Sequence, residues 1–231
     1  MKKSLAVAGF HDGSAGQVSG WIEENSTFKI CCYFSPEQFP KIEPKKENKK
    51  RVSQRMEYPS ENHLYGKPMY WGSEWLENLK KHNIKYVLPL EANNHQRLKI
   101  IKICKANGLR LASAIHPTCI IDRTAQVAKG VWINARAFVG FKAEISEGVI
   151  VNTGSIIEHH NVLKQCSQID PGVTTTGNCT VMKCGHIHTG ATLINKCIIG
   201  ENSIVGAGAL VRKNVKNNNT VVGIPAKILI K

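Results

Sequence analysis

Hydrophobic positions follow two different patterns along the chain, and the pattern changes near residue 118. Before that point, short apolar runs alternate with segments in which apolar residues recur at helical spacing. Leu5–Phe10 is the first apolar run, and Val18, Trp21 and Ile22 follow it at i, i+3 and i+4. Such alternation is typical of β-α-β units, so the first part is predicted to be a small parallel sheet with helices on its faces.

Two further helices are expected in this part of the chain. Ser73 is predicted to cap one of them, which ends in the cations of Lys80–His82. Asn93 or Asn94 is expected to begin the other, and Asn107-Gly108 is a typical stop signal for it. The other predicted strands are Phe28–Phe34, Tyr86–Leu90 and Leu109–Ile115.

From Cys119 onward the sequence repeats every six residues, through 16 uninterrupted hexads that end at Asn214. The third position of the hexad is Ile, Val or Leu in 15 of the 16, and Thr175 is the exception. Neither a helix nor a plain strand has a period of six, but a short strand followed by a corner does. Units of this size bury their apolar side only by stacking, so the repeat predicts a solenoid of short parallel strands.

Composition places a domain boundary at the same point. The first 118 residues hold 12 of the 15 aromatic residues but only 12 Val and Ile, whereas the remaining 113 hold 29 Val and Ile and 12 of the 19 Gly. We therefore predict an α/β domain over residues 1–118 and an all-β repeat domain with a C-terminal cap over residues 119–231.

The net charge of +14 indicates anionic partners without choosing among them. Part of the excess lies in residues 36–67, which are polar, contain proline and lack a period, so we interpret them as an inserted loop. Within it, Lys41–Arg55 carries seven basic and two acidic residues but no interleaved aromatics and no recognisable binding module. We expect a solvated loop here and no nucleic-acid partner.

No apolar run approaches the roughly 18–20 residues of a membrane span, and the start of the chain lacks a cleavage site. The eight cysteines form no CxxC pair, and most of them occupy small-residue positions of the repeat. We expect reduced packing residues, no membrane association and a cytoplasmic protein.

The hexads resemble the left-handed parallel β-helix of hexapeptide-repeat acyltransferases, in which three hexads form one triangular coil. Further motifs follow the α/β part in order, namely Ala114–Pro117, Asn152–Gly154, Glu158–His160, Gly206–Ala209 and Val222–Lys227. Together they resemble those of sugar acetyltransferases, which include bacillosamine and perosamine N-acetyltransferases and sialic-acid O-acetyltransferases. The similarity covers nearly the whole chain apart from the insertion.

In that family the histidine of the Glu-His motif is the general base, which corresponds to His159. A neutral imidazole suits this task near pH 7, because an attacking amine or hydroxyl must lose a proton. The family commonly places Asp or Glu directly after the base, where this chain has His160. Either another acid such as Glu158 or Asp170 substitutes, or the base works without one. We hypothesise that His160 is a second member of the catalytic site.

The resemblance implies acetyl-CoA as co-substrate, no metal, and a homotrimer with sites between neighbouring β-helices. Family contacts to CoA correspond to Gln168, Thr189 and Ala207, and Gly206 and Gly208 would let the ligand approach the backbone. The sugar or nucleotide-sugar acceptor is expected at the loop between the first strand and the first helix. Its residues are Gly9, Phe10, His11, Asp12, Gly13 and Ser14.

The leading hypothesis is N-acetylation of an amino sugar, carried on a nucleotide, for surface-glycan biosynthesis. O-acetylation of a sialic-acid-like sugar is the close alternative. Two more distant ones are a non-catalytic hexapeptide-repeat sugar-binding module and a β-helical zinc carbonic anhydrase. The latter would draw its ligands from His159, His160, His186 and His188, because imidazole is a good zinc ligand.

Overall fold

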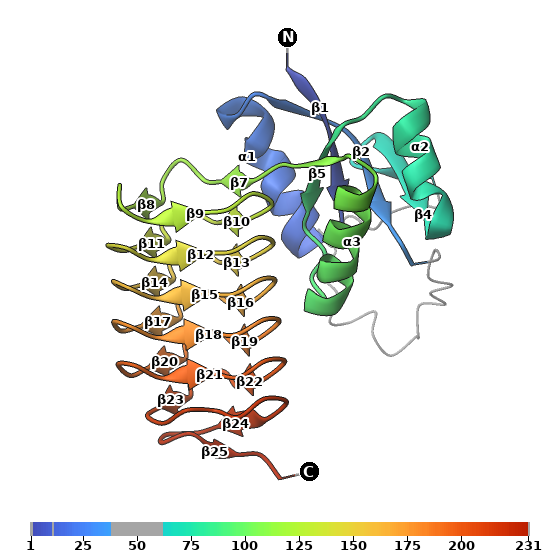
Figure 1. The fold of residues 1–231 in the computed structure, drawn as a ribbon. Helices are drawn as coiled ribbons and strands as arrows, with labels where there is room; N and C mark the ends of the chain where they lie inside the picture. Colours follow the sequence, from blue (N-terminus) through green and yellow to red (C-terminus); the bar gives the residue numbers. More distant parts are fainter. Residues whose placement is uncertain (1, 11, 38–61, 231) are drawn as a thin grey trace, which may run out of the picture. The chain divides into compact units, whose positions relative to one another are not determined.

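The computed structural model of the protein describes residues 2–10, 12–37 and 62–230 (Figure 1). The chain divides into two compact units, the first made of residues 1–92 and 102–111, the second of residues 93–101 and 112–231. The helix that contains residues 93–101 therefore contributes its first half to the second unit.

The first unit is a six-stranded sheet in the order β3-β4-β2-β1-β5-β6. Its pairs are parallel except for the hairpin of β3 and β4, so the predicted α/β class is confirmed. The strands are β1 (Lys3–Ala8), β2 (Phe28–Ser35), β3 (His63–Leu64), β4 (Lys67–Trp71), β5 (Tyr86–Pro89) and β6 (Arg110–Leu111). The helices are α1 (Gln17–Asn25), preceded by a π-helical turn (Asp12–Gly16), α2 (Trp75–Lys81), preceded by a 3₁₀ turn (Gly72–Glu74), and α3 (Asn94–Ala106).

Buried apolar side chains explain why these segments form this sheet. Residues 5–8 of the central strand β1 are fully buried, as a parallel strand covered on both faces requires. Phe34 of β2 stacks on Trp75 of α2 with ring centroids 4.3 Å apart. Asn93 accepts hydrogen bonds through its side chain from the backbone N–H groups of His95 and Gln96, which confirms the predicted helix start.

Three local expectations are corrected. Ser73 does not cap a helix, because it lies inside the 3₁₀ turn that precedes α2, and neither helical segment has a side-chain cap. The predicted loop 36–67 ends in β3 and the start of β4; its middle, residues 38–61, lies outside the described residues. The predicted strand Leu109–Ile115 is two short strands, and the second, β7 (Ala114–Ile115), pairs with β10 of the repeat.

The repeat forms a left-handed parallel β-helix with three faces, as predicted. Residues 18 positions apart pair between successive coils, for example Trp132 with Ile150. Figure 1 shows the coils stacked along one axis. Face 1 comprises β7, β10 (Trp132–Ile133), β13 (Ile150–Val151), β16 (Gln168–Ile169), β19 (His186–Ile187), β22 (Ile204–Val205), β24 (Thr220–Val222) and the antiparallel β25 (Lys227–Ile228).

Faces 2 and 3 are built in the same way, and the turns between strands form three edges, which we name 1–2, 2–3 and 3–1. Face 2 comprises β8 (Ile120–Ile121), β11 (Phe138–Val139), β14 (Ile156–Ile157), β17 (Thr174–Thr175), β20 (Thr192–Leu193) and β23 (Leu210–Val211). Face 3 comprises β9 (Gln126–Val127), β12 (Glu144–Ile145), β15 (Val162–Leu163), β18 (Thr180–Val181) and β21 (Ile198–Ile199).

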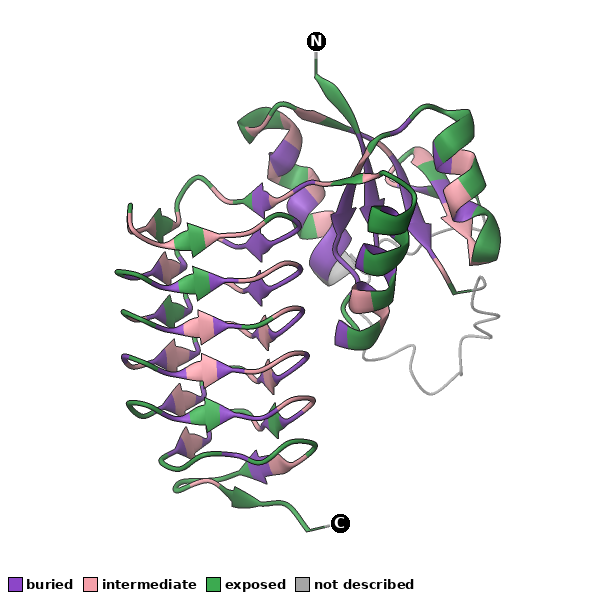
Figure 2. Cartoon of the chain, in the orientation of Figure 1, coloured by how far each residue is buried: buried purple, intermediate pink, exposed green. Residues whose placement is uncertain are grey.

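Each hexad contributes its second and third residues as a two-residue strand. The third residue points inward, and from Ile133 to Val211 its exposure never exceeds 2%. The second is half-buried or exposed in most coils, so the short strands alternate in burial along the chain (Figure 2). Thr175, the exception in the sequence pattern, is buried as well, and its hydroxyl donates to the backbone oxygen of Ile156 at 3.2 Å. That hydrogen bond satisfies a polar group inside the apolar column.

The sixth residue of the hexad lies at a corner of the β-helix and has a left-handed backbone conformation. From Gly130 to Gly208 every sixth residue has a positive φ, and glycine or asparagine holds eight of these fourteen positions. These two residue types adopt that conformation most readily. Arg136, Lys142 and His160 adopt it as well, with φ of 54–57°.

Arg97, in the first half of α3, is fully buried within the second unit. Its guanidinium donates to the backbone oxygens of Gly148 at 2.7 Å and Cys166 at 3.0 Å. Asn94 accepts from Arg97 at 2.6 Å and donates to the oxygen of Cys184 at 3.3 Å. Gly148, Cys166 and Cys184 are successive turn residues of edge 3–1, so this helix segment is anchored to three consecutive coils.

The eight cysteines carry thiols and form no disulfide, and six of them are buried. Burial raises the pKa of Cys104 to about 12, and burial together with the neighbouring Cys31 raises that of Cys32 to about 12. Thiols with such pKa values remain protonated near neutral pH and act as packing groups. Of the helices in the described ranges, none has both the length and the apolar character needed to cross a membrane.

Replacing the buried guanidinium tests the anchoring of α3. Arg97→Ala leaves the oxygens of Gly148 and Cys166 without this donor, so we expect the free energy of unfolding to fall by about 3 kcal/mol. Lys99→Ala, on the exposed face of the same helix, should change it by less than about 0.5 kcal/mol. Urea unfolding followed by circular dichroism measures both values. Equal effects of the two substitutions would contradict the anchoring role.

Candidate active site

His159 and His160 form the turn that follows β14, at edge 2–3 of the β-helix, and both are exposed. Their Nδ1 atoms lie 3.1 Å apart, so one ring donates a hydrogen bond to the other. The two rings are nearly perpendicular, at 85°. The structure thus brings together the two residues that the sequence nominates for catalysis.

The direction of this hydrogen bond fixes which nitrogen of His159 is basic. A neutral imidazole carries one proton, on one of its two nitrogens. When His159 donates through Nδ1 to His160, its Nε2 keeps a lone pair that can accept a proton from another molecule. His160 then plays the tautomer-fixing part that a carboxylate or a backbone carbonyl plays beside many functional histidines.

Gly177 makes room for the His159 ring. It occupies the same turn position one coil further on, 18 residues after His159. A Cβ at residue 177 would overlap Cε1 and Nε2 of the imidazole and lie 2.9 Å from its Nδ1. Gly177 does not have a positive φ. The backbone conformation at residue 177 would therefore accept alanine. Glycine is required there by the space that the His159 ring occupies, and not by the conformation of the turn.

The preceding coil holds the same turn from the other side. A Cβ at Gly140 would lie 3.0 Å from the carbonyl carbon of Glu158 and 3.1 Å from the nitrogen of His159. The Phe141 ring meets His160 edge-on, with centroids 5.5 Å apart. Aromatic contacts of this kind favour one ring orientation, so Phe141 helps to hold His160 beside His159.

Asn161 ties the turn to the interior of the β-helix. This residue is fully buried, and its amide group donates to the backbone oxygens of Glu158 at 2.7 Å and Thr176 at 3.0 Å. Its side-chain oxygen accepts from the N–H of Cys179 at 3.0 Å. Because the bond to Glu158 closes the turn and the other two link it to the next coil, Asn161 fixes the backbone that carries the two histidines.

Neither acid considered as a partner for His159 contacts its ring in this chain. Glu158 accepts a long hydrogen bond, 3.4 Å, from the backbone N–H of His159. Asp170 follows β16 at edge 1–2 and pairs with His186 and His188 instead. Among the described residues, the polar partner of the His159 imidazole is therefore His160.

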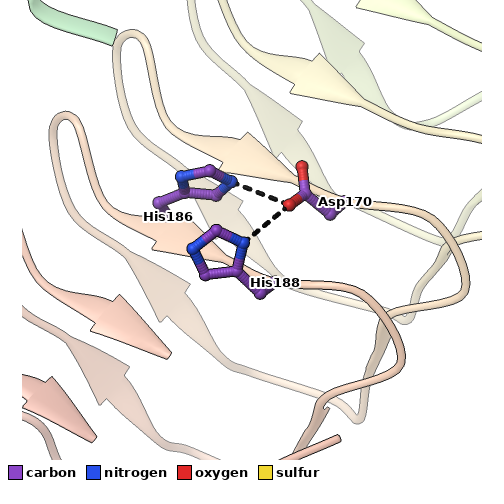
Figure 3. A group of neighbouring side chains, drawn as sticks. All are labelled: Asp170, His186 and His188. Carbon is purple, nitrogen blue, oxygen red and sulfur yellow. Dashed lines mark hydrogen bonds and ion pairs between the residues drawn. The ribbon is translucent and has the colours of Figure 1, made fainter. Parts of the chain in front are cut away.

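Asp170, His186 and His188 form a second polar cluster, on face 1 and the beginning of edge 1–2 (Figure 3). One carboxylate oxygen of Asp170, Oδ2, lies 2.9 Å from His186 Nε2 and 3.0 Å from His188 Nδ1. Its Oδ1 accepts from Gln168 at 2.9 Å. Burial opposes ionisation of Asp170, but the hydrogen bonds from His186 and Gln168 and the charges of both histidines outweigh it and keep its pKa below the ordinary value.

The residues expected to bind CoA lie at a different edge from His159. Thr189 and Ala207 occupy equivalent turn positions of edge 1–2, after β19 and β22, and the N–H of Gly208 donates to the oxygen of Thr189 at 2.9 Å. Gly208 has a φ of 65°, and a Cβ at Gly206 would lie 2.7 Å from Val222 Cγ1. Gln168 is on face 1, in β16. Within one chain, the expected base and the expected CoA contacts are thus not brought together, and the CoA contacts remain a prediction.

The expected acceptor loop connects β1 to α1 in the first unit. Gly9 has a φ of 111°, and a Cβ there would approach the oxygen of Leu90 to 3.2 Å, so glycine is needed at this position. Phe10 packs on Trp71 with ring centroids 5.0 Å apart, and Ser14 is buried. Asp12 and Gly13 lie in the π-helical turn, and His11 lies outside the described residues. Their role in binding an acceptor stays a prediction.

Sequence reasoning did not identify Gly177, Asn161 or the grouping around Asp170. The 18-residue spacing of three hexads places Gly177 next to His159, so counting coils could have found it. The His-x-His spacing placed His186 and His188 on one side of a strand, but their pairing with Asp170 depends on a neighbouring coil. Of the four histidines considered for a zinc enzyme, His159 and His160 lie at edge 2–3, whereas His186 lies on face 1 and His188 at the beginning of edge 1–2.

Comparisons with known proteins identify solved structures that share this fold. By sequence, no family model and no curated protein matches the chain. Among solved structures, perosamine N-acetyltransferase from Caulobacter crescentus, in complex with CoA and GDP-perosamine, superposes with a TM-score of 0.83 at 20% identity, over 98% of this chain and 97% of its own.

The acetyltransferase domain of PglB from Neisseria gonorrhoeae, in complex with acetyl coenzyme A, has a TM-score of 0.80 and 25% identity, over 99% of this chain and all of its own. WeeI from Acinetobacter baumannii has a TM-score of 0.59 and 19% identity over similar lengths. The chain therefore shares its entire fold, from the α/β unit to the β-helix, with sugar acetyltransferases.

A single methyl group tests the placement of the His159 ring. Gly177→Ala should displace this imidazole without changing the backbone, because the atoms that the new methyl group would meet belong to the flexible side chain of His159. We expect altered ¹H–¹⁵N signals of the His159 ring and a melting temperature within about 2 °C of wild type. Gly20→Ala, in α1 with nothing near its added Cβ, should leave the His159 signals unaltered. Unaltered His159 signals in Gly177→Ala would show that the ring does not rest on Gly177.

Proposed function

We propose that the protein is an acetyl-CoA-dependent acetyltransferase that acts on the amino group of an amino sugar carried on a nucleotide, in surface-glycan biosynthesis. The observation that carries this proposal is the exposed His159–His160 pair, seated on Gly177 at a corner of a β-helix whose whole architecture is that of sugar acetyltransferases. An isolated surface histidine would need no cleared space beside its ring.

Both substrate classes are supported by the relatives. The Caulobacter structure contains CoA and GDP-perosamine, and the Neisseria domain contains acetyl coenzyme A. Variants of the Caulobacter enzyme in which a histidine is replaced by asparagine or alanine are also in complex with CoA and GDP-perosamine. Acetyl-CoA as donor and a nucleotide-linked amino sugar as acceptor therefore fit this chain best.

The reaction proceeds by direct transfer. The acceptor nitrogen attacks the thioester carbonyl carbon of acetyl-CoA, and Nε2 of His159 takes the proton that the nitrogen loses. The C–S bond then breaks, the acetyl group remains on nitrogen as an amide, and the proton passes from His159 to the departing thiolate of CoA. Binding both substrates beside His159 supplies much of the rate acceleration, because it replaces a bimolecular encounter.

His160 sets the tautomer of the base in this mechanism. By accepting from Nδ1 of His159 it leaves Nε2 unprotonated at the start of each turnover. Unlike a carboxylate, a neutral imidazole does not offset the positive charge that forms on His159. We therefore assign His160 as a positioning residue that orients the base.

The complete site would form between two copies of the chain. His159 lies at edge 2–3, whereas Thr189, Ala207 and Gly208 lie at edge 1–2, so one copy supplies the base and its neighbour the CoA contacts. Three copies arranged around one axis would pair these edges in a closed ring. A homotrimer is therefore part of the proposal, with the acceptor bound at the Gly9–Ser14 loop.

The first test measures CoA release from acetyl-CoA with a panel of UDP-, GDP-, dTDP- and CMP-linked amino sugars and free sialic acids. We expect turnover with an amino sugar and a fall in kcat/KM of about 10²–10⁴-fold in His159→Ala, because general base catalysis is lost. Turnover with a sialic acid alone would favour O-acetylation. Absence of turnover with every acceptor would favour a sugar-binding module, and activity that survives in His159→Ala would remove this residue from its role.

The second test concerns His160. His160→Ala removes the acceptor that fixes the tautomer of His159, so we expect kcat to fall at least about tenfold while KM for acetyl-CoA changes little. His160→Asp restores an acceptor beside Nδ1 and should recover part of the loss. If His160→Ala leaves kcat/KM within about twofold of wild type, His160 has no part in positioning the base.

A further inference from the structure

The cluster of Asp170, His186 and His188 lies outside the proposed catalytic pair and has a geometry of its own. The strands β16 and β19 are neighbours on face 1, and Gln168 pairs with His186 in their register. His186 and His188 stand on either side of the inward-facing Ile187, so both side chains lie outside the β-helix. Asp170 follows the inward-facing Ile169 in the same way, one coil earlier.

This register brings three metal-ligand side chains to one point. The nearest ligand atoms of Asp170, His186 and His188 all lie within 4.8 Å of one another. Figure 3 shows both imidazoles directed at the same carboxylate oxygen. The imidazole planes are 35° apart, and their centroids are separated by 4.0 Å. The side chains are partly shielded, with 13% of Asp170, 22% of His186 and 39% of His188 exposed.

We infer that Asp170, His186 and His188 form a binding site for a divalent transition-metal ion, with zinc as the best fit. Two imidazole nitrogens and one carboxylate oxygen are a ligand set that zinc uses, with the fourth position left to water or another ligand. Ligands about 2.1 Å from a tetrahedral ion lie roughly 3.4 Å from each other. The Asp170 to histidine distances of 2.9 and 3.0 Å are shorter than this by about 0.4–0.5 Å, so the side chains would move slightly apart to admit an ion.

Hydrogen bonds alone leave one feature of the cluster unexplained. Gln168 donates to Asp170, but its own side-chain oxygen is buried and has no hydrogen-bond partner among the described residues. A buried polar atom without a partner is costly. A water in the fourth position of the ion is a donor of the kind that this oxygen needs, and the amide group of Gln168 already touches the cluster.

The ion would join two coils of face 1. It would stabilise the register of β16 and β19 beside Thr189, at the edge to which we assign the CoA contacts. This inference departs from the expectation that the chain holds no metal. It does not revive the carbonic anhydrase alternative, because its ligands come from one chain and include Asp170 instead of His159 and His160.

The test uses the full-length protein, treated with a chelator and then titrated with Zn²⁺ in competition with a zinc-binding dye. We expect one ion per chain, and a rise in melting temperature when zinc is added. Co²⁺ in place of Zn²⁺ should give the intense visible absorption of a tetrahedral site. This signature comes from the wild-type protein and does not depend on the folding of any variant.

Variants locate the ion. His186→Ala, His188→Ala and Asp170→Asn should each weaken zinc binding at least about tenfold, because loss of a ligand costs more than loss of a supporting hydrogen bond. His95→Ala, an exposed histidine on α3, serves as the matched control and should bind zinc as wild type does. Zinc binding that is lost in a His159→Ala, His160→Ala double variant but kept in the three others would overturn the proposal. So would binding below about one ion per five chains at a tenfold excess of zinc over protein.

Discussion

The structure of the second unit depends on one constraint, which is that each coil of the repeat from β7 to β23 must close in 18 residues. Closure requires a turn after each short strand, and the backbone makes that turn with a left-handed residue at every sixth position. The inward third residue of each hexad then stacks on its counterparts in a continuous apolar column, which supplies the burial that single hexads lack. Once this register is set, each side chain lies next to the residue 18 positions before it and the residue 18 positions after it.

The candidate site follows directly from that register. Gly177 is where the coil after His159 passes under its ring, and Gly140 is where the coil before it passes the Glu158–His159 peptide. Asn161 occupies an inward position normally given to a small residue, and its three backbone hydrogen bonds replace the burial of apolar surface at that corner. The His159 side chain is therefore exposed to solvent, while the peptide that carries it is fixed from three sides.

The repeat could be predicted from the sequence because its period is local and regular. The role of His159 as general base follows from the motif that contains it and stays a prediction. Features that depend on contacts between coils or elements could not be predicted. Asp170 reaches His186 across 16 residues, a spacing that no single-strand pattern displays. Ser73 has the chemistry of a helix cap, but a 3₁₀ turn extends the helix start past it. The run Leu109–Ile115 is apolar enough for one strand, yet β7 pairs with the β-helix and β6 with the first sheet.

The carboxylates of this chain bear on how His159 can work. In the part of the chain that the structure describes, Glu158 accepts a hydrogen bond from the backbone N–H of His159. Asp170 forms hydrogen bonds with His186 and His188 instead. In the proposed mechanism, the positive charge that forms on His159 during proton transfer would therefore meet the imidazole of His160, and not a carboxylate, within its own chain. Under the proposed function, any stronger electrostatic stabilisation would have to come from the anionic phosphates of the proposed nucleotide-linked acceptor or from a neighbouring copy at edge 2–3. In the proposed mechanism, catalysis would thus depend on assembly and on the charge of the substrate.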